Sequence, residues 1–191
     1  AMQLWKSTCL KNKTVAIEGL GKVGWELANH LFWAGAKLIV TDIDKERLDQ
    51  AEKKLGATIV SPKEFTSTQC DILSPCATGG SLNKESIPKL QCLAIAGAAN
   101  NQLDTDDDGT LLLEKNIIYA PDYVINAGGL ISLSAFRKEE NASKIPTLAR
   151  EKTNLIYDRL IAIFQESQEK SIATNIITNQ LAEQKIQSSH Q

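Results

Sequence analysis

Three glycines spaced as Gly-x-Gly-x-x-Gly, at Gly19, Gly21 and Gly24, constrain the fold of this chain more than any other feature. They begin directly after a short β-prone run, residues 14–18, and lead into a helix-like stretch, residues 23–34. The first glycine permits a tight turn, the second lets another group approach the backbone, and the third lets the helix pack closely on the strand. The pattern predicts a strand, a turn and a helix whose N-terminal N–H groups favour an anion.

The rest of the chain alternates strand-like and helix-like segments in the same way. After the first strand, strand-like runs occupy residues 37–42, 57–60, 71–74, 93–96 and 117–120. A helix is expected at residues 45–55, between the second and third strands. Strands that alternate with helices pair in parallel through right-handed crossovers. The predicted fold is therefore α/β, a doubly wound Rossmann-type parallel sheet.

The length of 191 residues suits one main domain with additions, because domains usually contain roughly 100 to 200 residues. We expect an N-terminal connecting segment at residues 1–12 and the Rossmann domain at residues 13–136. Residues 137–145 are polar and are expected to form a linker. Residues 146–191 carry apolar side chains at helical spacing, which predicts two amphipathic C-terminal helices.

The composition excludes several classes of partner. Hydrophobic residues make up 42% of the chain and charged residues 23%, as in ordinary folded soluble proteins. A formal net charge of -2 provides no general attraction to nucleic acid or to anionic membranes. No window approaches the ~20 apolar residues of a membrane span, and the first residues lack the apolar stretch of a secretory signal. The protein is expected to be cytoplasmic, with neither nucleic acid nor a membrane as partner.

Neither a zinc site nor a disulfide is expected, because the four cysteines have no Cys-x-x-Cys spacing and the chain has only two histidines. The acidic run from Asp104 to Gly109 imitates the start of a calcium-binding loop. Such a loop requires a bidentate glutamate at its twelfth position, but Lys115 stands there. The run is expected to be a solvated loop before a helix at residues 110–115, and no metal site is predicted.

Asp42 strengthens the interpretation of the glycine spacing as a dinucleotide site. It ends the second predicted strand, where a carboxylate accepts hydrogen bonds from both ribose hydroxyls of NAD and repels a 2′-phosphate. Lys45 and Arg47 lie close enough to weaken the preference for NAD over NADP, and the alternative is that both are simply solvated surface charges on the following helix. The alternative is that the glycines merely form a tight turn between strand and helix. With Asp42 in this place, NAD is the expected cofactor.

Small and polar residues follow the later strands, where ligands of doubly wound sheets collect. The segments are residues 75–80, 97–102 and 121–129, and their asparagines offer amide donors and acceptors. Gly128 and Gly129 fall within a helix for which Asp122 is the expected N-cap. Each helical glycine costs about 1 kcal/mol relative to alanine. Close approach of a ligand explains that cost, and close helix packing is the alternative.

Five ordered segments resemble one family. GLGKVG, KLIVTDID, PCATGGSLN, IAGAANNQL and YAPDYVINAGGLI look like the nucleotide-binding domain of the leucine, phenylalanine, valine and tryptophan dehydrogenases, within the glutamate dehydrogenase superfamily. The match runs from about Lys13 to Ile131. The resemblance implies NAD-dependent, reversible oxidative deamination of an apolar L-amino acid, branched-chain or aromatic, to its 2-oxo acid. It also implies a homo-oligomer for the intact enzyme.

The resemblance implies which residues bind the coenzyme and the substrate. The coenzyme-binding residues are Gly19, Gly21, Lys22, Val23, Gly24, Asp42, Ile43, Cys76, Ala77, Thr78, Ala98 and Asn100. Asn126 faces the substrate, and Leu130 and Leu133 form an apolar wall. Glutamate-specific relatives have a serine at the place of Leu133, where it helps to hold the side-chain carboxylate. An apolar substrate is therefore favoured over glutamate.

Catalytic residues are not expected within these 191 residues. The resemblance implies that lysines act as the catalytic bases. In the family, these lysines belong to a preceding domain with a GGGK-like segment. No lysine here has that glycine context. The chain is therefore expected to be a fragment that binds NAD without turnover. The alternative function is a non-catalytic NAD-sensing or ligand-binding module, whereas a methyltransferase is disfavoured by the asparagines after the later strands.

Overall fold

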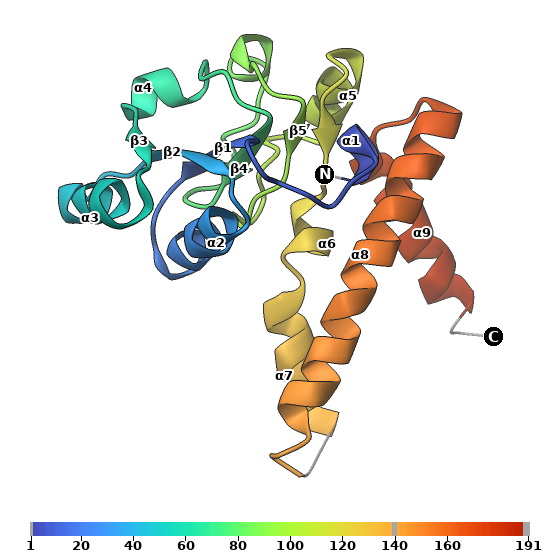
Figure 1. Cartoon of the computed structure of the whole chain (residues 1–191). Helices are drawn as coiled ribbons and strands as arrows, with labels where there is room; N and C mark the ends of the chain where they lie inside the picture. Colours follow the sequence, from blue (N-terminus) through green and yellow to red (C-terminus); the bar gives the residue numbers. More distant parts are fainter. Residues whose placement is uncertain (1, 139–140, 189–191) are drawn as a thin grey trace.

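The computed structural model of the protein describes residues 2–138 and 141–188 (Figure 1). Its strands form one six-stranded sheet in the order β3-β2-β1-β4-β5-β6, and every neighbouring pair is parallel. The strands are β1 Thr14–Glu18, β2 Lys37–Thr41, β3 Thr58–Ile59, β4 Ile72–Pro75, β5 Ala94–Ile95 and β6 Ile118–Tyr119. This is the strand order of a Rossmann-type sheet, so the predicted fold class is confirmed.

Helices precede the sheet, connect its strands and follow it. They are α1 Met2–Trp5, α2 Lys22–Trp33, α3 Lys45–Leu55, α4 Pro62–Phe65, α5 Asp107–Glu114, α6 Asp122–Ile125, α7 Gly128–Lys138, α8 Ile145–Lys170 and α9 Thr174–Ser188, with a 3-10 turn, η1, at Ile87–Lys89. The bounds of α3 show how local sequence sets them. Asp44 caps its first turn by accepting from the N–H groups of Glu46 and Arg47, and Gly56 ends it in the left-handed conformation.

The alternation of side chains along β1 divides the core into two layers. Val15 and Ile17 point to one face of the sheet, where they pack with apolar residues of α2 and α3 such as Leu55. Ala16 points to the opposite face, where it belongs to a cluster with Leu112 of α5. Both faces of β1 are covered by apolar side chains, as in parallel sheets generally. Polar groups that contact a ligand must therefore lie at the ends of the strands, not on the faces of the sheet.

The later elements differ from their expected bounds by a few residues. β5 and β6 contain 2 residues each, although the apolar runs predict longer strands. Backbone pairing continues one residue further, since the N–H groups of Ala96 and Ala120 donate to the carbonyls of Leu73 and Ile95 at 2.9 Å. α5 begins at Asp107, earlier than the predicted start at residue 110.

The helix expected to start at Asp122 is interrupted. α6 ends at Ile125, Asn126 follows it, and α7 begins at Gly128. The prediction that Asp122 is the N-cap was wrong, because Pro121 occupies that position and no side chain caps α6. α7 continues to Lys138, into the segment expected to be a linker. Residues 139–140 of that segment and residues 189–191 of the C-terminal segment lie outside the described residues.

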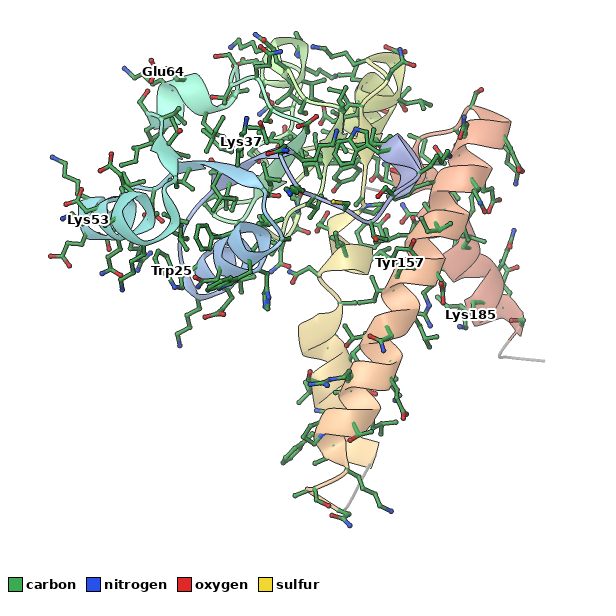
Figure 2. The ribbon with its side chains drawn as sticks, in the orientation of Figure 1. Trp25, Lys37, Lys53, Glu64, Tyr157 and Lys185 are labelled. Carbon is green, nitrogen blue, oxygen red and sulfur yellow. The ribbon has the colours of Figure 1, made fainter. Side chains whose placement is uncertain are left out.

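Two C-terminal helices, α8 and α9, follow as predicted. Figure 1 shows α7 and the first half of α8 side by side, projecting away from the sheet. Further along α8, Tyr157 (labelled in Figure 2) and Phe164 line a cavity together with Ile118 of β6, so this part of the helix lies against the sheet. Within the described residues, no helix combines the length and apolar character needed to cross a membrane.

Candidate coenzyme-binding site

The glycine loop between β1 and α2 is closed on one side and open on the other. Gly19 has φ +91, and an added Cβ would lie 2.9 Å from Cβ of Ala77, so a side chain is strained there. An added Cβ on Gly24 would overlap the carbonyl oxygen of Gly19. Around Gly21, in contrast, no atom beyond Gly21 and its two chain neighbours lies within 4 Å of an added Cβ. Gly21 is the N-cap of α2, so this open space borders the free N–H groups of a helix N-terminus.

Asp42, directly after β2, connects the second strand to the glycine loop through a side-chain hydrogen bond. Its carboxylate accepts a hydrogen bond from the N–H of Leu20 and another from the N–H of Asp44 at 2.8 Å. The side chain of Asp42 is only 5% exposed. Nη1 of Arg47 lies 3.8 Å from Oδ2 of Asp42, and its Nε lies 3.2 Å from Oδ2 of Asp44. The carboxylate therefore has a preset orientation next to the loop, and one cation borders it.

The loop after β4 connects the glycine loop to the loop after β5. An added Cβ on Gly24 would lie 3.4 Å from Cβ of Cys76, which places this cysteine against the start of α2. Ala77 and Thr78 follow and are exposed. An added Cβ on Gly79 would lie 2.5 Å from the carbonyl oxygen of Asn100. The predicted coenzyme residues of these three loops thus form one continuous edge, at the carboxyl ends of the strands.

Asn126 joins this edge from the bend between α6 and α7. Its side-chain Nδ2 donates to the carbonyl oxygen of Ala98 and to Oδ1 of Asn100, both at 2.9 Å. Parallel strands bring their carboxyl ends to the same edge of a sheet, which explains why residues 26 positions apart meet here. The structure therefore brings together Asn100, predicted to bind coenzyme, and Asn126, predicted to face substrate.

Asp122 makes a second set of hydrogen bonds between the loop after β5 and the segment after β6, and it is only 6% exposed. Oδ2 of Asp122 accepts from the N–H of Asn101 at 2.8 Å, and Oδ1 accepts from the hydroxyl of Tyr119 at 2.7 Å. Burial, reinforced by Asp122, raises the pKa of the Tyr119 hydroxyl, which therefore stays protonated and can donate. Sequence reasoning missed this role of the three residues. The available signal was their position beside the ends of β5 and β6.

Glu18 and Cys76 are two further titratable groups at this edge. Burial raises the pKa of the Glu18 carboxyl at the end of β1. Burial also raises the pKa of the Cys76 thiol, and the nearby charge of Glu18 adds to the effect. A protonated thiol is a weak nucleophile, so Cys76 suits the wall of a binding site better than a reactive role. No cluster of three or more metal-ligating His, Cys, Asp or Glu side chains occurs in the described part of the chain.

The remaining predicted site residues are exposed. Lys22 and Val23 begin α2, next to the open space at Gly21. Ile43, directly after Asp42, is 96% exposed, which is unusual for an isoleucine. Leu130 and Leu133 are exposed on α7, beyond the bend at Asn126. The two leucines lie about one helical turn apart, so they share one face of the helix.

Comparisons with known proteins place the chain in a family. Residues 37–185 match the model of the Glutamate/Leucine/Phenylalanine/Valine dehydrogenase family. Leucine dehydrogenase of Thermoactinomyces intermedius is 41% identical over 187 residues, covering 98% of this chain and 50% of that protein. L-tryptophan dehydrogenase of Nostoc punctiforme (strain ATCC 29133 / PCC 73102) is 44% identical over 189 residues, covering 97% of this chain and 52% of that protein. The crystal structure of L-tryptophan dehydrogenase from Nostoc punctiforme superposes with a TM-score of 0.90 and 40% identity, covering 99% of this chain and 56% of that one.

The chain spans about half the length of the curated relatives it matches. The family match covers most of the chain, and both relatives match nearly all of it. The resemblance inferred from the five sequence segments is therefore confirmed. This chain belongs to the glutamate/leucine/phenylalanine/valine dehydrogenase family.

Proposed function

We propose that this chain is the NAD-binding part of an amino-acid dehydrogenase that oxidatively deaminates an apolar L-amino acid to its 2-oxo acid. The observation that carries the proposal is the open backbone at Gly21 beside the oriented carboxylate of Asp42. The similarity to a leucine dehydrogenase and an L-tryptophan dehydrogenase supports the reaction and the apolar side chain of the substrate. The base that accepts the substrate proton is proposed to lie outside these 191 residues.

The residues at the carboxyl edge of the sheet fit NAD. The N–H groups at the start of α2 suit the pyrophosphate, because Gly21 leaves room for close approach to the backbone. Asp42 suits the two adenosine ribose hydroxyls, and exposed Ile43 offers an apolar surface to the adenine. Asn100 and Asn126 supply amide groups toward the nicotinamide and the substrate. When bound, the nicotinamide supplies the hydride acceptor, while these residues hold and orient it.

The chain is expected to bind NAD more tightly than NADP, and Asp42→Ala is expected to reduce that preference by ~1.5 to 3 kcal/mol, the size of a charge-assisted hydrogen bond. The physical reason is that Asp42 accepts from free hydroxyls and repels a 2′-phosphate. Isothermal titration calorimetry with both dinucleotides measures the two affinities. Tighter binding of NADP than of NAD by the unaltered chain would contradict the role of Asp42.

Asp42→Asn is the matched control, because its carbonyl oxygen can still accept from the N–H of Leu20 while the charge is removed. Its thermal unfolding should resemble that of the unaltered chain more closely than the unfolding of Asp42→Ala does. Loss of the NAD preference in Asp42→Asn with an unchanged melting temperature then assigns the effect to charge. If the NAD preference is lost only together with a lowered melting temperature, the effect of the substitution is on the fold.

The proposed substrate site uses Asn126, Leu130 and Leu133, and it predicts discrimination against glutamate by the whole enzyme. A glutamate side chain beside two leucines would bury a carboxylate without a partner, at a cost of several kcal/mol. An aliphatic or aromatic side chain gains about 25 cal/mol per Å² of buried apolar area instead. The measurement compares kcat/KM for leucine, phenylalanine, tryptophan and glutamate. Glutamate as the best substrate would overturn the assignment of Leu133.

A further inference from the structure

We propose that Arg47 forms a cationic subsite for a 2′-phosphate at the adenosine end of the coenzyme site, so that this chain binds NADP as well as NAD, with NAD still preferred. The proposal rests on the proposed function, because it places the adenosine ribose at Asp42. It adds a residue that sets coenzyme specificity and identifies its ligand chemistry, a phosphate monoester on the ribose.

Arg47 is held in place by contacts at both ends. At the backbone, its N–H donates to Oδ1 of Asp44, the N-cap of α3, at 3.4 Å. At the guanidinium, Nε lies 3.2 Å from Oδ2 of Asp44, and Nη1 lies 3.8 Å from Oδ2 of Asp42. Asp44 therefore holds both the start of the side chain and its head. A guanidinium held in this way loses less freedom when it binds a ligand.

The guanidinium borders the place where the ribose hydroxyls bind. A hydroxyl that donates to Asp42 lies about 2.7 Å from one of its oxygens. Since Nη1 of Arg47 is 3.8 Å from Oδ2 of Asp42, a 2′-oxygen bonded to Oδ2 lies at most about 6.5 Å from Nη1. A phosphate on that oxygen adds further atoms next to the guanidinium of Arg47, whose side chain is 49% exposed and so accessible to a ligand. Arginine beside the ribose is the usual means of accommodating a 2′-phosphate.

The charges around Asp42 favour this role for Arg47 over its neighbours. Both oxygens of Asp42 accept backbone N–H groups, so the carboxylate keeps these hydrogen bonds when Arg47 turns to a phosphate. Its charge still repels the phosphate, which is why NAD remains preferred. Lys45 stands on the same turn of α3, but no ion pair connects it to Asp42 or Asp44 within the described residues. Lys45 is therefore a second cation in this region, but no ion pair in the part of the chain that the structure describes orients its side chain as the two carboxylates orient Arg47. α3 packs against α2, and Figure 2 labels Lys53 on α3 and Trp25 on α2.

Calorimetry with the 191-residue chain tests the proposal, using NAD, NADP and two fragments, 5′-AMP and adenosine 2′,5′-bisphosphate. Arg47→Leu should weaken NADP and the bisphosphate about fivefold to tenfold, a modest effect because the guanidinium is half exposed. The same variant should leave NAD and 5′-AMP within about twofold. Arg47→Lys, which keeps the charge but loses the Nε contact, should give an intermediate loss.

Lys45→Gln is the matched control, because it removes one positive charge from the same turn. It should change the affinity for NADP by less than about twofold. Equal weakening by Lys45→Gln and Arg47→Leu, an unchanged affinity of Arg47→Leu for NADP, or no measurable binding of NADP by the unaltered chain would each overturn the proposal. Failure of the unaltered chain to bind NAD would instead contradict the proposed function itself, and the inference with it.

Discussion

Gly21→Ala should weaken NAD binding by about tenfold to a hundredfold, equivalent to the loss of a charge-assisted hydrogen bond to the pyrophosphate. The fold should remain, because no atom beyond Gly21 and its two chain neighbours lies within 4 Å of the added Cβ and the backbone of Gly21, at φ -65, suits alanine. Alanine is a poorer N-cap than glycine, so the free energy of unfolding should fall by no more than about 1 kcal/mol. Calorimetry with NAD and urea denaturation measure the two effects separately.

Gly24→Ala provides the contrast, with the same added methyl group on the closed side of the loop. Its Cβ would overlap the carbonyl oxygen of Gly19 and lie 3.0 Å from the carbonyl carbon. That peptide cannot move freely, because its N–H, which belongs to Leu20, donates to Oδ2 of Asp42. The expected loss of stability is about 3 kcal/mol or more, with NAD binding lost as a consequence. Similar stability losses in the two variants would contradict the open space at Gly21, and an unchanged affinity of folded Gly21→Ala for NAD would show that this space is not a ligand site.

Asp122→Ala is expected to destabilise the chain by about 3 to 5 kcal/mol, since two hydrogen bonds to a buried carboxylate are lost together. The N–H of Asn101 and the hydroxyl of Tyr119 would both be left without this acceptor in the interior. The same change releases the loop that carries Asn100, so the affinity for NAD should fall as well. Urea denaturation and calorimetry of the folded fraction measure these two effects.

Tyr119→Phe is the control for this network, because it removes one donor and retains the ring. The bond from Asn101 to Asp122 should survive, so the expected cost is about 1 to 2 kcal/mol. A loss below about 1 kcal/mol for Asp122→Ala would show that the carboxylate does not hold the loop after β5. An affinity for NAD unchanged in both folded variants would limit the network to a role in stability.

The glycine loop and Asp42 could be predicted from sequence because the information is local. Tight turns, helix starts and close strand-to-helix packing each demand particular residues within a few positions of one another. The bounds of α3 were predicted from its periodicity, and the structure shows the local features that set them, the cap at Asp44 and the left-handed glycine at Gly56. The later strand segments were predicted less well, since two-residue strands leave little alternation to recognise.

The interrupted helix after β6 could not be predicted in the same way. Asp122 precedes a helix-like segment, and its sequence position alone favours an N-cap. In the fold, its carboxylate turns instead toward Asn101 and Tyr119, because satisfying buried donors outweighs a cap on a helix of 4 residues. The bend that follows at Asn126 allows its amide to reach Asn100.

The sequence by itself determined the strand-turn-helix unit, the class of sheet and the carboxylate expected at the ribose, because each depends on short-range steric and hydrogen-bonding rules. Only the tertiary structure decided which polar groups meet. Gly79 touches Asn100, Asn126 bonds Asn100, and Arg47 reaches Asp42. The physical reason is that parallel pairing gathers the carboxyl ends of separate strands at one edge, and side-chain rotamers and helix breaks then select the partners that burial requires to be satisfied.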